Sequence, residues 1–225
     1  MWSTSYSSKT HLGSDIWEFC FTRPAGFDYV PGQYAAFAFA EPLGDPRGQS
    51  RTMSLTSHPN DNYLAFVTRI PERGSPFKQR LSQMQEGELL FVDTALGDLV
   101  LPRIPATPLV FVAGGIGIAS YISMLWDMER SDESRSVHLL YALRAHEERL
   151  FPELLGRFPF TSYQEYVSPD RLSVGNILQA AKNEPDALYY LSGTERFVET
   201  LRADLLATGL TDTQIVFDYF TGYVE

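Results

Sequence analysis

A run of glycines after an apolar segment is the clearest candidate for chemistry in the sequence. Leu109 to Ala113 is apolar throughout, and Gly114, Gly115 and Gly117 follow it directly. Glycines at the end of a strand let backbone N–H groups approach a phosphate, and the start of a following helix adds a favourable dipole. The same residues would also suit a turn that only packs a strand against a helix. The loop therefore indicates either nucleotide binding or packing.

Two further segments have residue types that could bind an anion. Arg51 carries a planar guanidinium that suits a pyrophosphate, and Ser54 is small enough to lie beside a ring. Residues 73–78 contain a glycine followed by Ser75 as a helix N-cap and Pro76 in the first turn. The simpler interpretations are a surface arginine and a well-capped helix. Together with the glycine loop, these segments are more informative than any one of them alone.

Two C-terminal segments complete the set of candidates. The apolar segment Leu188–Leu191 is followed by Ser192, Gly193 and Thr194, a third turn of the kind that can bind phosphate. Four aromatic residues within 217–223 either pin the end of the chain by packing or cover a planar ligand. The sequence has no metal-ligand spacing, nucleophile elbow or Walker lysine, so we expect no metal site and no hydrolase.

Two kinds of secondary structure must position these candidates. Short apolar segments separated by turns predict an antiparallel barrel or sandwich in the first hundred residues. After Leu101, alternating strands and helices predict a parallel sheet covered on both faces. The expected strands of the first part are Ile16–Phe21, Tyr34–Phe39, Arg51–Ser57, Tyr63–Ile70 and Leu89–Asp93, with a helix from Ser75. In the second part we expect strands Leu109–Ala113, Val137–Leu143, Tyr163–Val167, Leu188–Leu191 and Ile215–Phe217, and helices ending near Met128, beginning near Glu147, and spanning Val174–Ala181 and Phe197–Leu206.

The composition excludes several classes of protein. The 225 residues are 44% hydrophobic and carry a formal net charge of -10, which fits a globular chain and argues against nucleic-acid binding. Residues 1–103 carry 9 basic and 11 acidic side chains, whereas residues 104–225 carry 9 and 17. A single cysteine, Cys20, excludes a disulfide framework and fits the cytoplasm. The uncharged stretch 104–126 is interrupted by prolines and glycines, so we expect no membrane span there.

In chain order, these segments resemble the ferredoxin–NADP reductase superfamily of flavoproteins. The resemblance rests on Pro31-Gly32-Gln33-Tyr34, Arg51 to Ser57, Gly74-Ser75, Gly114 to Ile118, Tyr141 to Arg144, Leu191 to Thr194 and Asp218-Tyr219-Phe220. It covers almost the whole chain. It implies an FAD-binding antiparallel β-barrel of Greek-key type in residues 1–103 and an NAD(P)-binding α/β domain with a parallel sheet in residues 104–225.

The resemblance also implies a reaction and a set of site residues. Hydride would pass from NADH or NADPH to the N5 atom of FAD, and electrons would leave to a separate acceptor protein or a small molecule. Ser54 would hydrogen-bond near N5 and Phe220 would shield the flavin, so both are predicted catalytic residues. The implied flavin contacts are Arg51, Thr52, Met53, Ser54, Thr68, Arg69, Ile70, Gly74, Ser75, Pro76 and Phe220. The implied nicotinamide-dinucleotide contacts are Gly114, Gly115, Ile116, Gly117, Arg144, Gly193 and Thr194.

Some residues depart from the family pattern and keep alternatives open. Met53 replaces the usual tyrosine beside the flavin, which is compatible with a free-flavin reductase that uses flavin as a substrate. Ser120 and Ser192 replace a proline and a cysteine near the expected site of hydride transfer, which is compatible with an FAD-binding subunit that has no turnover. Arg144 could meet a 2′-phosphate, but Glu147 and Glu148 oppose it, so the sequence favours neither nicotinamide.

Overall fold

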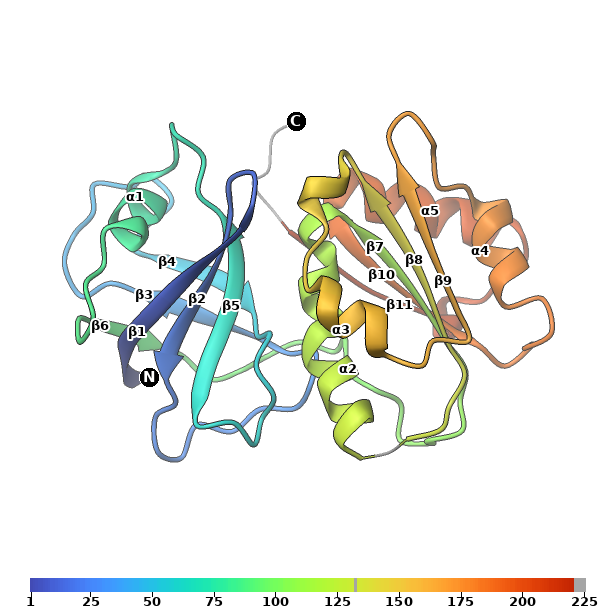
Figure 1. Cartoon of the computed structure of the whole chain (residues 1–225), viewed down its shortest axis with the longest axis horizontal. Coiled ribbons are helices and arrows are strands. Elements are labelled where there is room, and N and C mark those ends of the chain that lie inside the picture. The colour runs from blue at the N-terminus through green and yellow to red at the C-terminus, as the bar shows by residue number, and fades with distance from the viewer. Residues whose placement is uncertain (132, 221–225) are drawn as a thin grey trace.

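The computed structural model describes residues 1–131 and 133–220 and contains two sheets side by side (Figure 1). The first is antiparallel, with strand order β4-β3-β6-β1-β2-β5. Its elements are β1 (Trp2–Gly13), β2 (Ile16–Thr22), β3 (Tyr34–Ala38), β4 (Ser50–Ser54), β5 (Tyr63–Arg69), α1 (Pro76–Ser82) and β6 (Leu89–Val92). A bridge between Leu55 and Phe66 joins the two edges, which closes the sheet into a barrel.

Phenylalanine rings fill the inside of this barrel. Phe21 and Phe66 stack with their centroids 5.5 Å apart, and the Phe37 ring lies 4.7 Å from Phe66. All three side chains are completely buried. Alternate residues of each strand point inward, and burying such large apolar surfaces stabilises the barrel.

The second sheet is parallel and is covered by helices on both faces. Its strand order is β11-β10-β7-β8-β9. Its elements are β7 (Leu109–Gly114), α2 (Ala119–Arg130), β8 (Val137–Leu143), α3 (Pro152–Arg157), β9 (Ser162–Val167), α4 (Val174–Ala180), β10 (Leu188–Thr194), α5 (Glu195–Ala207) and β11 (Ile215–Phe220). Helices α2 and α3 lie on the face toward the barrel, and α4 and α5 on the opposite face (Figure 1). The strand order reverses between β7 and β10, a position where open α/β sheets bind ligands.

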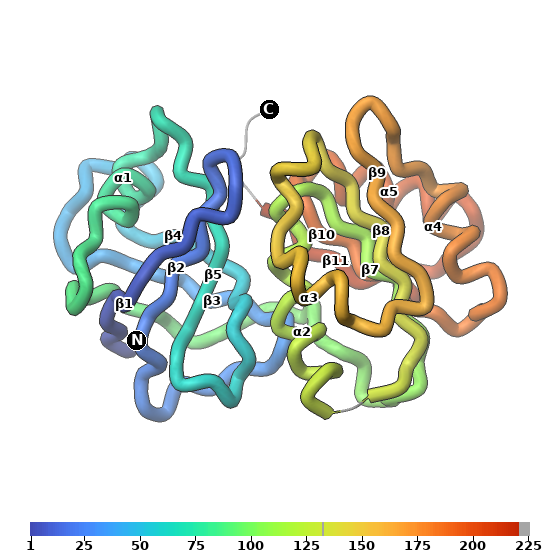
Figure 2. Tube along the Cα trace, in the orientation of Figure 1, coloured from blue at the N-terminus to red at the C-terminus, as the bar shows by residue number. Residues whose placement is uncertain are grey.

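The predicted fold class is confirmed, a barrel followed by an α/β half with a parallel sheet. The chain passes from one half to the other along residues 93–108 (Figure 2), so the predicted boundary at residues 103 and 104 falls between the sheets. The boundary itself stays a prediction. No helix in the described ranges is long and apolar enough to cross a membrane.

Three local predictions differ from the structure. β1 was not among the expected strands, because its serines and threonines hide the alternation and only Thr4 and Tyr6 are buried. Ser192 to Thr194 is not a turn, because β10 continues to Thr194 and α5 begins at the next residue. The helix expected near Glu147 is a single 3-10 turn, His146–Glu148, and α3 begins only at Pro152.

A row of polar residues on α2 joins the two halves. Ser120, Ser123, Asp127 and Arg130 recur at intervals of three and four residues, which places them on one face of the helix. We call these four residues the polar row. Their partners in the barrel half are the Ser54 hydroxyl at 3.2 Å, the Gly32 N–H at 2.8 Å, His58 Nε2 at 3.1 Å and the Asp61 carboxylate at 2.7 Å, in the same order. The halves are therefore held together by directional hydrogen bonds and ion pairs.

Gly32 lies at the closest point of this contact. Its φ is +95°, and a Cβ added there would lie 2.0 Å from the Leu99 carbonyl oxygen and 2.2 Å from Met124 Cε. Only a residue without a side chain lets the barrel turn approach α2 this closely.

We expect Gly32→Ala to lower the free energy of unfolding much more than Gly26→Ala. Gly26 also has a positive φ, +75°, but a Cβ there meets nothing within 4 Å. Both changes carry a backbone cost of about 1–2 kcal/mol, and Gly32→Ala adds about 1–3 kcal/mol for overpacking. Urea denaturation of the two variants measures the difference, and equal destabilisation would contradict the proposed close contact.

Candidate functional site

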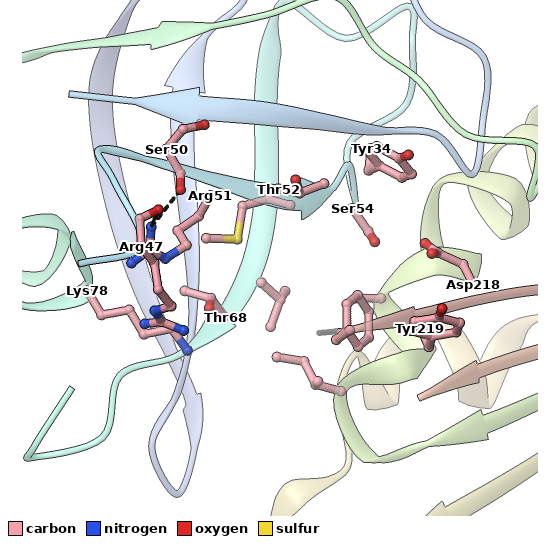
Figure 3. Close-up of a pocket in the computed structure, with 15 residues that line it drawn as sticks. Tyr34, Arg47, Ser50, Arg51, Thr52, Ser54, Thr68, Lys78, Asp218 and Tyr219 are labelled. Carbon is pink, nitrogen blue, oxygen red and sulfur yellow. Dashed lines mark hydrogen bonds between the residues drawn. The ribbon is translucent and has the colours of Figure 1, made fainter. Parts of the chain in front are cut away.

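A cavity of about 580 Å³ lies between the two halves, and we call it the cleft cavity (Figure 3). The barrel half contributes β4 and parts of β3 and β5, and the α/β half contributes the start of α2 and the end of β11. Seven of the predicted site residues line it: Arg51, Thr52, Met53, Ser54, Thr68, Ile116 and Phe220. Its walls thus come from both sheets.

The two ends of the cleft cavity differ in chemistry. Arg47, Arg51 and Lys78 gather at one end, whereas Ser54 and Asp218 lie toward the other (Figure 3). A cationic end suits phosphate groups, and a hydroxyl suits a hydrogen bond to a ring edge. The cavity therefore matches a long ligand with a charged end and a planar end.

Asp218 is an acidic residue at the ring end that was not among the predicted site residues. Burial raises the pKa of its carboxyl above the usual value, and the backbone N–H of Tyr219 counteracts this only in part. In the parallel pairing of β10 and β11, Asp218 lies opposite Ser192. A carboxyl with a raised pKa in a cleft is a common feature of functional sites.

Arg51 is not free in the cleft cavity. Its guanidinium forms an ion pair with Asp45 and donates to the carbonyl oxygens of Ser50 at 2.6 Å and Gly48 at 3.1 Å. It also lies over the Phe77 ring, 5.3 Å from the centroid. Arg51, which the sequence predicts to bind a pyrophosphate, is therefore held by the loop that precedes β4 of its own chain.

Asp45 fills the anion position beside Arg51. Its side chain is 1% exposed and accepts the backbone N–H groups of Arg47 at 2.9 Å and Phe77 at 3.4 Å. Burial acts to raise the pKa of this carboxyl, but the two N–H donors and the guanidinium groups of Arg51 and Arg47 outweigh it and lower the pKa. A charged carboxylate is thus the anion that pairs with Arg51 in this structure.

A second cavity of about 910 Å³ adjoins the first, and we call it the basic cavity. It lies between the loop before α1 and the carboxyl ends of β7, β8 and β10. Arg47, Lys78, Ile116 and Phe220 line both cavities. The predicted residues that line the basic cavity are Arg69, Gly74, Ser75, Gly114, Gly115, Ile116, Arg144, Thr194 and Phe220.

The basic cavity is positively charged although the chain is acidic. Its lining includes six basic and three acidic side chains. Arg69 is neutralised by Asp15 at 2.5 Å and by Glu148 at 2.8 Å. In the part of the chain that the structure describes, Arg73, Arg144 and Arg171 form no ion pair or hydrogen bond. These three exposed guanidinium groups are suited to bind an anion.

Most glycines of the predicted nucleotide loop are explained by packing. A Cβ on Gly114 or Gly193 would come within 2.9 or 2.8 Å of the Phe197 ring. A Cβ on Gly117 would lie 2.3 Å from the carbonyl oxygen of Ser192. Gly115, with φ +53° and open space where a Cβ would be, lines the basic cavity without such a packing contact. Packing therefore explains Gly114 and Gly117, and nucleotide binding by the loop stays a prediction.

Four predicted residues do not line these two cavities within the described chain: Ile70, Pro76, Gly117 and Gly193. Several lining residues were not predicted, among them Tyr34, Arg47, Lys78, Arg171, Phe197 and Asp218. Asp218 and Tyr34 belong to segments that carried the family resemblance, so those segments already held a signal. Nothing in the local sequence marks Arg171, because only the fold brings it to the carboxyl end of β8.

Comparisons with known proteins agree with this geometry. No protein-family model matches the sequence. The chain is 28% identical over 215 residues to a flavohemoprotein of Bordetella pertussis, covering 86% of the chain and 53% of that protein. It is 26% identical over 217 residues to the reductase component of a propane 2-monooxygenase of Rhodococcus jostii, covering 88% and 57%. The chain spans about half the length of these curated relatives.

A solved structure decides the fold. The chain superimposes with a TM-score of 0.81 on a ferredoxin NADP+ reductase of Neisseria gonorrhoeae with bound FAD and NADP, covering 97% of this chain and 98% of the other at 21% identity. The chain has the ferredoxin–NADP reductase-like fold. The fold that the resemblance implies from the sequence is thereby confirmed. In this fold the cleft cavity and the basic cavity lie where the barrel meets the carboxyl ends of the parallel strands.

We expect Asp45→Asn to strengthen the binding of inorganic pyrophosphate about tenfold. Asparagine keeps the shape of the side chain but removes the charge that competes for Arg51, and a charge-assisted hydrogen bond contributes about 1.5–3 kcal/mol. Isothermal titration calorimetry at low ionic strength measures the affinity. Asp28→Asn is the matched control, because it removes the same charge from the ion pair with Arg23, where Asp28 is 89% exposed. Equal effects of the two variants would contradict competition at Arg51.

Proposed function

We propose that the chain is an FAD-dependent NAD(P)H oxidoreductase that passes electrons to a separate acceptor. The observation that carries the proposal is the cleft cavity, where β4 of the barrel, the start of α2 and the end of β11 enclose one space with a cationic end and a hydroxyl end. Bound FAD would accept hydride from the nicotinamide and release electrons singly or in pairs. The protein's contribution is to bind and orient both nucleotides and to exclude water.

The residues of the cleft cavity fit such a cofactor. Val67 and Met53 offer apolar surface to a ring, and a thioether packs well against aromatic faces. Ser54 would hydrogen-bond to the ring edge, and Phe220 would cover the ring from the α/β side. Lys78, in the first turn of α1, would face the phosphates. On this proposal residues 1–103 bind FAD and residues 104–225 bind the nicotinamide nucleotide.

The acceptor is proposed to be another protein or a small molecule. One relative is named as the reductase component of a monooxygenase, which is consistent with electron delivery to a separate partner. The single cysteine, Cys20, cannot hold an iron–sulfur cluster within these 225 residues. A reducing compartment suits this cysteine, so we propose that the protein acts in the cytoplasm.

A free-flavin reductase is the second candidate, and one observation favours it. Arg51 is held by Asp45, so a flavin nucleotide with a pyrophosphate must compete with a carboxylate already in place. Such competition would weaken the binding of the flavin nucleotide and favour its exchange with flavin in solution. Gel filtration separates the two candidates: a reductase with resident FAD elutes yellow, whereas a free-flavin reductase elutes colourless and turns over added flavin.

We expect the purified or FAD-loaded protein to show a flavin spectrum that NADH or NADPH bleaches under anaerobic conditions. The measurement is absorbance near the flavin bands during anaerobic titration. A colourless protein that takes up no FAD and reduces no added flavin would contradict the proposal. Bound FAD that neither nicotinamide reduces would instead indicate the subunit without turnover.

The basic cavity further supports NADPH as the preferred donor. Arg144 follows β8 at the carboxyl edge of the sheet, and Arg171 lies across the same cavity in the segment between β9 and α4. Of the two glutamates that oppose Arg144 in the sequence, Glu148 forms an ion pair with Arg69, and Glu147 does not line the basic cavity. Two exposed arginines without a carboxylate partner in the described chain are suited to a phosphate dianion.

We expect Arg144→Ala and Arg171→Ala each to raise the KM for NADPH about tenfold or more and to leave the KM for NADH nearly unchanged. A charge-assisted hydrogen bond to the 2′-phosphate contributes about 1.5–3 kcal/mol, and NADH lacks this phosphate. Steady-state kinetics with both nucleotides measures the split. Arg103→Ala is the control, since Arg103 also forms no ion pair among the described residues but lies outside both cavities. An equal rise in the KM for NADH would contradict the assignment of these arginines to the 2′-phosphate.

A further inference from the structure

Three buried hydroxyl groups form a continuous chain at the ring end of the cleft cavity. The Ser192 hydroxyl donates to Ser120 Oγ at 3.2 Å, and Ser120 Oγ lies 3.2 Å from Ser54 Oγ. Ser120 and Ser192 are completely buried, and Ser54 is 5% exposed. Ser54 lies in the barrel half, whereas the other two belong to the α/β half.

We propose that Ser120 is a positioning residue that directs the Ser54 hydroxyl proton into the cleft cavity. The inference rests on the proposed function, in which that proton meets the flavin ring edge. Ser120 itself touches neither nucleotide in this assignment, because it lies behind Ser54 and does not line the cavity.

The direction of the hydrogen bonds follows from counting donors. Each serine has one proton to donate and a pair of acceptor positions. Ser192 gives its proton to Ser120, and Ser120 is completely buried with no acceptor for its own proton in the described chain except Ser54 Oγ. If Ser54 donated instead, the Ser120 proton would be buried without a partner, so Ser120 donates to Ser54. In the described chain the Ser54 hydroxyl has no other hydrogen-bond partner, so its proton points away from Ser120 and toward the open cavity.

Because the three hydroxyl groups are buried, the loss of a hydrogen bond between them is destabilising. A buried hydroxyl without a partner is destabilising, so the three groups stabilise one another in a single orientation. With alanine at position 120, Ser54 would lose its donor and could rotate toward other acceptors. The orientation of Ser54 thus depends on a residue that is 66 positions away in the chain.

The experiment compares four variants with bound FAD: Ser120→Ala, Ser54→Ala, the double variant and Ser123→Ala. Ser123 is the matched control, because its hydroxyl also joins α2 to the barrel half, through the Gly32 N–H, but has no link to Ser54. The measurements are the absorbance spectrum and midpoint potential of the bound flavin, the rate of anaerobic flavin reduction by NADPH, and the thermal midpoint.

We expect Ser120→Ala to shift the flavin spectrum and potential in the same direction as Ser54→Ala and to slow reduction about tenfold. The double variant is expected to match Ser54→Ala, because Ser120 acts only through Ser54. Ser123→Ala is expected to lower the thermal midpoint and leave the spectrum and potential unchanged.

Two results would overturn the inference while the proposed function stands. One is a Ser120→Ala protein with the wild-type spectrum and potential, and the other is additive effects of Ser120→Ala and Ser54→Ala. A wild-type protein that neither binds nor reduces flavin would instead remove the proposed function, and the inference with it. The two failures are therefore distinguishable.

Discussion

The docking of α2 on the barrel is the interaction on which the site depends. Both cavities take walls from both halves, so neither exists unless the halves keep a fixed distance and orientation. Packing alone would let two curved surfaces slide, whereas hydrogen bonds and ion pairs at fixed positions define one arrangement. The polar row supplies four such bonds along one face of a helix, and Gly32 lets the backbones approach closely enough for them to form.

Most arginines of this acidic chain are paired, and three unpaired ones of the described ranges gather at one cavity. The chain has an excess of acidic residues, and most arginines are held by one or two carboxylates. Exposed guanidinium groups without such a partner in the described ranges are therefore informative, and three of them face the basic cavity. A local positive potential inside an acidic surface attracts a multiply charged anion to one place and repels it elsewhere. Specific recognition of nucleotides is thus compatible with a low pI.

Much of the fold was predictable, because strand and helix periodicity follows from which residues are buried. Val137–Leu143 is apolar except for His138, and its predicted bounds match β8. β1 was missed because its polar residues carry no such signal.

The site was predictable where one segment carries its residues, as in β4. The site was not predictable where the fold brings distant residues together. Arg171 reaches the basic cavity through the topology of the sheet. The contact of Asp45 with Arg51 depends on how the loop before β4 folds back. The packing of Gly117 on Ser192 likewise depends on the contact of the 3-10 turn after β7 with β10, which is distant in the chain.

The pairing of Asp45 with Arg51 bears on how such a protein acquires its cofactor. A buried arginine facing an empty phosphate site would be an unpaired charge, and a chain with that defect would be least stable before the cofactor arrives. Here a carboxylate from the same chain pairs with the guanidinium, so the charge of Arg51 is already balanced within the barrel. On the proposed function, cofactor loading would be the exchange of one anion for another within a folded protein. Synthesis of the chain and supply of the nucleotide would then not have to coincide in time.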